Sequence, residues 1–109
     1  MSRRVHDHAA ILKILHNATP ARQKNIIHTC DKELLECLSE CAKNVLKGNV
    51  PLTAVQKQSL SRHRNNLRKL VLKTTTQKHK KKILQSGGFL GALVTPILSL
   101  LGGLFNGAG

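Results

Sequence analysis

The feature that most constrains this chain is the way its charge is divided along the sequence. The five acidic residues all lie within the first 40 positions, and twelve of the 18 basic residues lie between Lys43 and Lys82 with no acidic residue among them. No charged side chain follows Lys82. Segments so unlike in charge favour different surroundings. We therefore divide the chain into a helical module (1–50), a basic segment (51–86) and an apolar tail (87–109).

The size and overall charge narrow the class of protein. A chain of 109 residues buries only a small core, so a large active-site cleft is not expected. A net charge of +13 favours a polyanionic partner, either nucleic acid or an anionic membrane. The N-terminus has no apolar run of signal-peptide length, so we expect an intracellular, reducing setting.

Aromatic residues are nearly absent, which limits how nucleic acid could be recognised. There is no Trp or Tyr, and the two Phe residues both lie in the tail. Proteins that bind single strands or read RNA sequence usually stack bases on aromatic rings, and the basic segment has none. Phosphate contact is the remaining mode of binding.

Helical spacing of apolar residues predicts an all-α fold: a small bundle of short helices with a basic helix and a hydrophobic, Gly-rich C-terminal helix or tail. We expect one helix over 5–16 and a second beginning with Thr19 as N-cap and Pro20 in the first turn. A third helix over 31–47 should end at Gly48.

The basic segment begins with a capping box, in which Thr53 is the N-cap and Gln56 follows three residues later. We expect this helix to run to about Leu72, with an apolar line on one side and basic residues at spacings of four and seven beside it. A break at 74–76 precedes the dense cluster 78–82, which is typical of a nuclear-import signal or a nucleic-acid patch. A merely solvated face is the alternative, but such a face normally mixes both signs of charge. The predicted nucleic-acid-binding residues are Lys57, Arg62, Arg64, Arg68, Lys69, Lys73, Lys78, Lys80, Lys81 and Lys82.

Residues that could carry catalysis or bind metal form no convincing site. Cys30, Cys37 and Cys41 share one helical face, but that face is apolar and zinc sites usually draw ligands from two chain segments. Cysteines four apart on a helix do not reach disulfide geometry. The sequence has no nucleophile elbow, phosphate loop or paired carboxylates. We therefore expect no enzyme activity, no metal and no cofactor.

The tail is apolar or small-sided from Phe89 to Phe105 apart from Thr95 and Ser99, at the lower edge of the ~17 to 25 residues that span a membrane. Small residues recur every four positions, at Gly91, Thr95, Ser99 and Gly103, as in close helix contacts in lipid. We favour contact with a membrane or another copy over folding back onto the N-terminal helices. The predicted contact residues are Phe89, Leu90, Leu93, Ile97, Leu100, Leu101, Leu104 and Phe105.

The run KKKILQSGGFL, from Lys80 to Leu90, resembles the precursor of the small adenovirus core protein called mu, or X. In that family, and in related short proteins of polinton and adintovirus elements, a basic stretch, a Gly-Gly pair and an apolar tail follow in the same order. The resemblance implies a virion core protein that acts in the virion and the host nucleus. It also implies a maturation-protease site at Gln85 to Gly88, with Gly87-Gly88 as the Gly-Gly pair and cleavage after Gly88.

Together these observations favour a non-enzymatic viral core protein that binds and condenses double-stranded DNA through phosphate contacts, without reading sequence. The N-terminal helices would then serve as a scaffold or for self-association. The rival hypothesis is a membrane-active protein whose basic region docks on anionic lipid and whose tail inserts. A third is a transposon-derived product that retains no activity.

Overall fold

The computed structural model describes residues 3–102, and over these residues the chain folds into short helices joined by turns and loops, without strands. The predicted all-α bundle is confirmed. The helices are α1 (Arg3–Asp7), α2 (Ala9–Asn17), α3 (Pro20–Thr29), α4 (Lys32–Leu46), α5 (Ala54–Arg62), α6 (Arg64–Val71), α7 (Gln77–Leu84) and α8 (Phe89–Leu100).

Four helices begin with a side chain that accepts a hydrogen bond from a backbone N–H of the first turn. These N-caps are Thr19, Asp31, Thr53 and Thr76. At Thr53 the predicted capping box is present, because the side chain of Gln56 also accepts from the Thr53 N–H at 3.0 Å. Each such cap stabilises a helix by about 1 kcal/mol. Local sequence therefore fixes where these helices start.

Two helices expected to be continuous are instead broken at a histidine. His8 separates α1 from α2, and His63 separates α5 from α6; their φ,ψ values are −101°, 11° and −108°, 18°. The single helices predicted for 5–16 and from Thr53 to about Leu72 were therefore wrong. The bend at His63 lets α5 pack on α8 while α6 packs on α4. The apolar line expected along this helix does not hold in the first turn of α5, where Val55 is 76% exposed.

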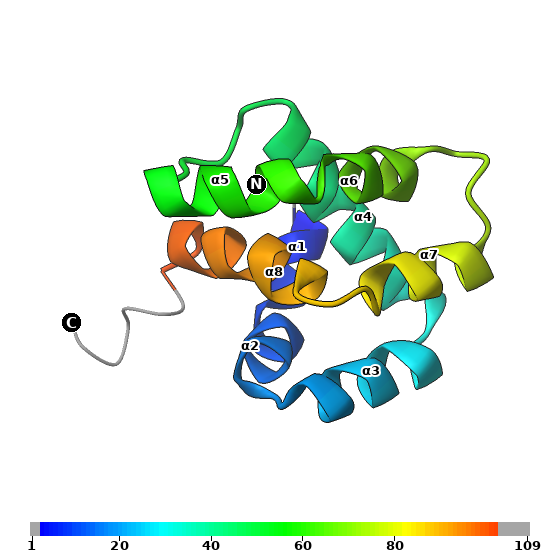
Figure 1. Ribbon diagram of the computed structural model, residues 1–109. Coiled ribbons are helices and arrows are strands. Elements are labelled where there is room, and N and C mark those ends of the chain that lie inside the picture. The colour runs from blue at the N-terminus through cyan, green and yellow to red at the C-terminus, as the bar shows by residue number, and fades with distance from the viewer. Residues whose placement is uncertain (1–2, 103–109) are drawn as a thin grey trace.

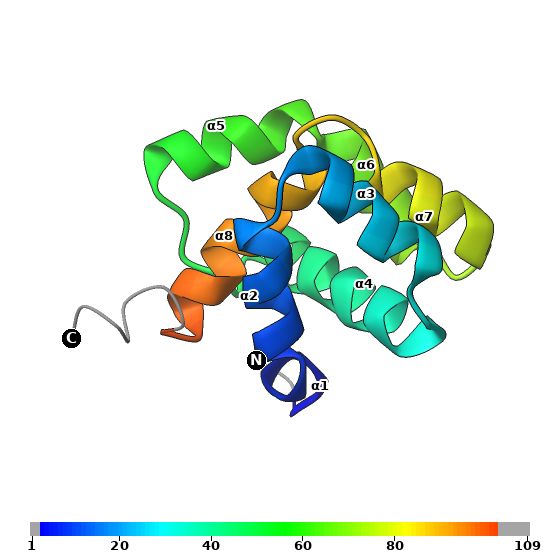
Figure 2. The same ribbon diagram turned by 90° about the horizontal axis from the view of Figure 1, so that it is seen from below.

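Helix α8 lies in the middle of the bundle, between α5 above and α2 below in Figure 1. Figure 2 shows α2 lying beside α8 and α3 alongside α7. Phe89, Leu93 and Ile97 are fully buried in one core that includes residues from every helix from α1 to α8. A helix that is apolar on all sides fits such a central position.

The burial of α8 corrects our preference for an exposed tail. Of the predicted membrane or oligomer contacts, Phe89, Leu90, Leu93 and Ile97 are buried in the core, and Leu101 is half-buried. Leu100 is 40% exposed, whereas Leu104 and Phe105 lie outside the described residues. The expected boundaries near 50 and 86 separate segments of different charge that share one core.

The small-residue positions of α8 lie at the edge of this internal packing, and at Gly91 an added Cβ would meet nothing within 4 Å. Gly91, Thr95 and Ser99 are half-buried, and the Thr95 hydroxyl lies 3.3 Å from Nδ1 of His16 on α2. Gly103 lies outside the described residues. Within 3–102 no single helix is long and apolar enough to cross a membrane; α7 and α8 meet that criterion only as a pair, and they are bent by 86°.

Candidate nucleic-acid interface

The predicted binding residues present their charge to solvent. Eight of the ten are exposed, and Lys80 and Lys81 are half-buried. Within 3–102, the ion pairs closer than 4 Å are those of Arg4 with Glu33 and Glu40, so none of the ten is neutralised by a carboxylate. The charge of these ten residues is therefore available to an anion in solution.

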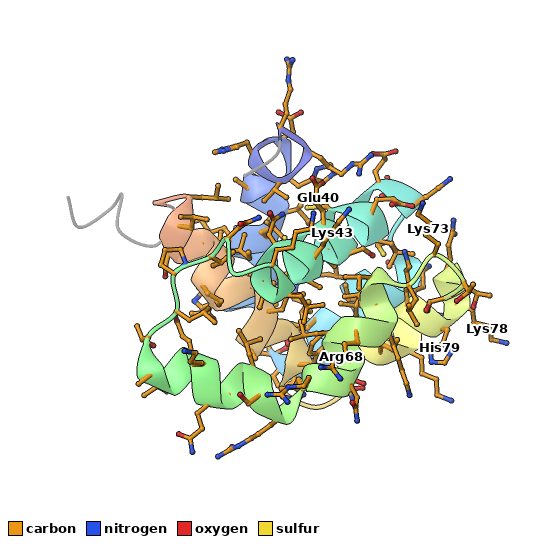
Figure 3. The ribbon with its side chains drawn as sticks, turned by 90° about the horizontal axis from the view of Figure 1, so that it is seen from above. Glu40, Lys43, Arg68, Lys73, Lys78 and His79 are labelled. Carbon is orange, nitrogen blue, oxygen red and sulfur yellow. The ribbon has the colours of Figure 1, made fainter. Side chains whose placement is uncertain are left out.

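The ten residues do not form a single patch. Lys57 belongs to α5, and α5 and α7 lie toward opposite ends of the molecule in Figure 1. Figure 3 shows Arg68 on α6 on the same side of the molecule as Lys43 on α4, with Lys73 beyond them in the loop after α6. Lys78 lies at the outer end of α7 in the same view. The cations that line one groove together come from the C-terminal end of α4, the loop after α6 and α7.

Helix α7 is held against its neighbours by buried apolar side chains and by a hydrogen bond from Lys81. Ile83 and Leu84 are buried, and Thr76 caps the first turn. The Nζ of Lys81 donates a hydrogen bond of 2.9 Å to the backbone carbonyl of His28, in the last turn of α3. A cation at a helix C-terminus is favourable, so Lys81 helps to hold α7 against α3.

A groove lies between α4 and the C-terminal end of α6 with the loop that follows it, and it reaches Lys80 in the middle of α7; we call it the α4–α6 groove. Four lysines line this groove, and all of them follow the last acidic residue in the sequence: Lys43, Lys47, Lys73 and Lys80.

Two carboxylates, Glu36 and Glu40, also line the α4–α6 groove. Oε2 of Glu40 lies 3.7 Å from Nη1 of Arg4, which also lines the groove, and it has no hydrogen-bond partner within the described residues. Arg4 thus balances Glu40, and the four lysines outnumber the remaining Glu36. The groove is positive overall.

A second groove lies on the α3 side of α7; we call it the α3–α7 groove. It is lined by His28, Gln77, Lys78, Lys81, Lys82 and Gln85, with no acidic residue among them. Every charged group in this groove therefore attracts an anion.

Sequence reasoning did not include Lys43 and Lys47 among the candidate binding residues, although both line the α4–α6 groove. Their spacing of four places them on one face near the C-terminus of α4, next to the loop residue Lys73 that the chain reaches only after α6. The signal that could have found them is their position beyond Glu40, the last acidic residue.

Gly87 and Gly88, the predicted protease site, are exposed but folded into a closed turn. The Phe89 N–H donates to the Ser86 carbonyl at 3.1 Å, and Gly88 has a φ of +78°, which favours glycine. The buried residues Leu84 and Phe89 anchor both sides of this turn. A protease that binds its substrate in an extended form would have to open this turn.

The cysteines occupy the core, as their apolar neighbours indicated. Cys37 and Cys41 are buried and Cys30 is half-buried. A hydrogen bond to Cys37, together with burial, raises the pKa of the Cys41 thiol, and burial raises the pKa of Cys30. Among residues 3–102, no three His, Cys, Asp or Glu side chains gather in a way that could hold a metal ion.

Comparison with known proteins found no similarity: no protein family, curated protein or solved structure matches this chain.

Proposed function

We propose that this chain is a non-enzymatic core protein that binds and condenses double-stranded DNA by pairing its cations with phosphates, without reading bases. The observation that carries the proposal is the set of cations on α5, α6, α7 and the α6–α7 loop that no carboxylate neutralises. Phosphate contacts of this kind position a protein on the duplex and carry no direct sequence information. The absence of aromatic residues from the basic segment supports the same mode.

The placement of α8 supports DNA binding over membrane insertion. An inserting tail would have to leave the core, because its apolar residues Phe89, Leu93 and Ile97 are fully buried there. The exposed cations, by contrast, need no rearrangement to meet a phosphate backbone.

The proposal includes the origin that the Lys80 to Leu90 resemblance implies: a core protein of an adenovirus-like virus or element, acting in the virion and the host nucleus. A maturation protease that cleaves after Gly88 is part of this proposal. Since the Gly87-Gly88 turn is closed by hydrogen bonds, cleavage requires local opening of the α7–α8 connection.

Binding of the full chain to two unrelated duplexes of equal length tests the proposal, measured by fluorescence anisotropy between 50 and 200 mM salt. We expect equal affinities for the two sequences and, if ~6 to 10 phosphates are engaged, a loss of ~10³ to 10⁵ in affinity over that range. Affinity that hardly responds to salt, or that differs strongly between the duplexes, would refute it. Leakage of a dye from anionic liposomes at the same protein concentrations would favour the membrane hypothesis.

A further inference from the structure

The lysines of α7 point to two different sides of the helix. Lys80 precedes the buried residues Ile83 and Leu84 by three and four positions, so it lies on their face and is half-buried. It reaches the α4–α6 groove. Lys78 and Lys82, four residues apart, are exposed and line the α3–α7 groove. One helix therefore supplies cations to two separate grooves.

The neighbours of α7 keep these two grooves apart. Helix α7 contacts α6 and α4 on one side and α3 on the other, and Figure 1 shows it between α6 above and α3 below. In Figure 3, Lys43 and Lys73 lie along α4 and the α6–α7 loop, whereas Lys78 extends from the outer end of α7.

A straight duplex does not follow the surface of α7 from one groove to the other. DNA has a persistence length of about 50 nm, so bending one duplex around a protein whose largest extent is 39 Å costs free energy. Nor can α7 insert into a major groove about 12 Å wide and touch the phosphates on both sides, because α6 and α3 pack against it. Occupation of both grooves without bending the DNA therefore takes two duplex segments.

Resting on the DNA binding proposed above, we propose that one copy of the chain bridges two duplexes, one in the α4–α6 groove and one in the α3–α7 groove. The ligand of each groove is the phosphate backbone. Lys43, Lys47, Lys73 and Lys80 contact one backbone, and Lys78, Lys81 and Lys82 contact the other. Condensation then follows from each folded copy and needs no contact between copies.

The test is a bridging assay, in which one duplex is fixed to beads and a second, labelled duplex is captured through the full chain. Lys43→Gln/Lys73→Gln weakens the first groove, and Lys78→Gln/Lys82→Gln weakens the second with the same change in charge. All four lysines are exposed, and Lys81 is kept because it holds the His28 carbonyl. Lys13→Gln/Lys24→Gln, with exposed lysines on α2 and α3 that line neither groove, is the matched control.

We expect each groove variant to bind the fixed duplex and to capture about tenfold less of the second duplex or still less, because two phosphate contacts are lost. The control should capture as much as the parent. A mixture of the two groove variants should remain defective, since neither copy has two intact grooves.

Three results would overturn the inference. Either groove variant could capture as much of the second duplex as the parent, or the mixture of variants could restore capture, which would assign bridging to self-association. If the parent fails to bind the fixed duplex at all, DNA binding itself is refuted and bridging with it. Thermal unfolding of every variant checks that the fold is retained.

Discussion

Leu93→Ala tests whether α8 belongs to the core. Leu93 is fully buried in the middle of α8, and replacing a buried leucine with alanine costs about 2 to 5 kcal/mol through lost burial and the cavity left behind. Native domains are stable by only about 5 to 15 kcal/mol, so this is a large fraction of the total. At roughly 4 to 8 °C per kcal/mol, the midpoint of thermal unfolding should fall by at least about 8 °C.

The matched control for Leu93 is Leu100→Ala in the same helix. Leu100 is 40% exposed, so its truncation should change the free energy of unfolding by less than about 1 kcal/mol. Both variants are compared with the parent by circular dichroism during thermal and urea unfolding. Equal, small effects of the two substitutions would mean that α8 does not pack in the bundle, and the account of the tail as core would fail.

Further expected outcomes concern α8, the α4–α6 groove and the thiols. Gly91→Ala should stabilise the chain by about 0.4 to 1 kcal/mol in urea unfolding, because an added Cβ meets nothing within 4 Å and alanine favours helix; destabilisation would contradict the packing of α8. Glu36→Gln should raise DNA affinity about twofold to fivefold by removing a carboxylate from the groove, and an unchanged affinity would place the phosphates elsewhere. A maleimide should modify half-buried Cys30 before the buried Cys37 and Cys41 in the native chain, as followed by mass spectrometry after digestion. The rate of Cys30 modification should keep rising with pH beyond the ordinary thiol pKa, because burial raises the pKa of that thiol. Modification of Cys37 or Cys41 before Cys30 would contradict this burial.

Local signals in the sequence were sufficient to predict several helix boundaries. Thr19, Thr53 and Gly48 act through hydrogen bonds and backbone angles within a few residues of themselves, so a linear reading finds them. The breaks at His8 and His63 have another origin, because they let consecutive helices pack on different partners. Nothing near either histidine in the sequence marks such a choice.

The tail and the grooves show why the rest of the account needed three dimensions. A helix that is apolar on every side fits either a membrane or the centre of a bundle. Here it is buried because α2, α4 and α5 pack against it, which the sequence of the tail alone does not show. In the same way, Lys43 and Lys73 are thirty residues apart in sequence and line one groove because α6 packs against α4.

The most direct test of DNA binding through these cations is the salt slope of Arg64→Gln/Arg68→Gln beside that of Lys13→Gln/Lys24→Gln. The two variants lose the same charge from exposed positions, but only Arg64 and Arg68 lie on the proposed DNA-binding surface. We predict that the slope of log affinity against log salt flattens by about 1.8 in the first variant and stays at the parent value in the second. Equal slopes in both variants would mean that net charge alone attracts DNA, and would contradict an interface built on α5, α6 and α7.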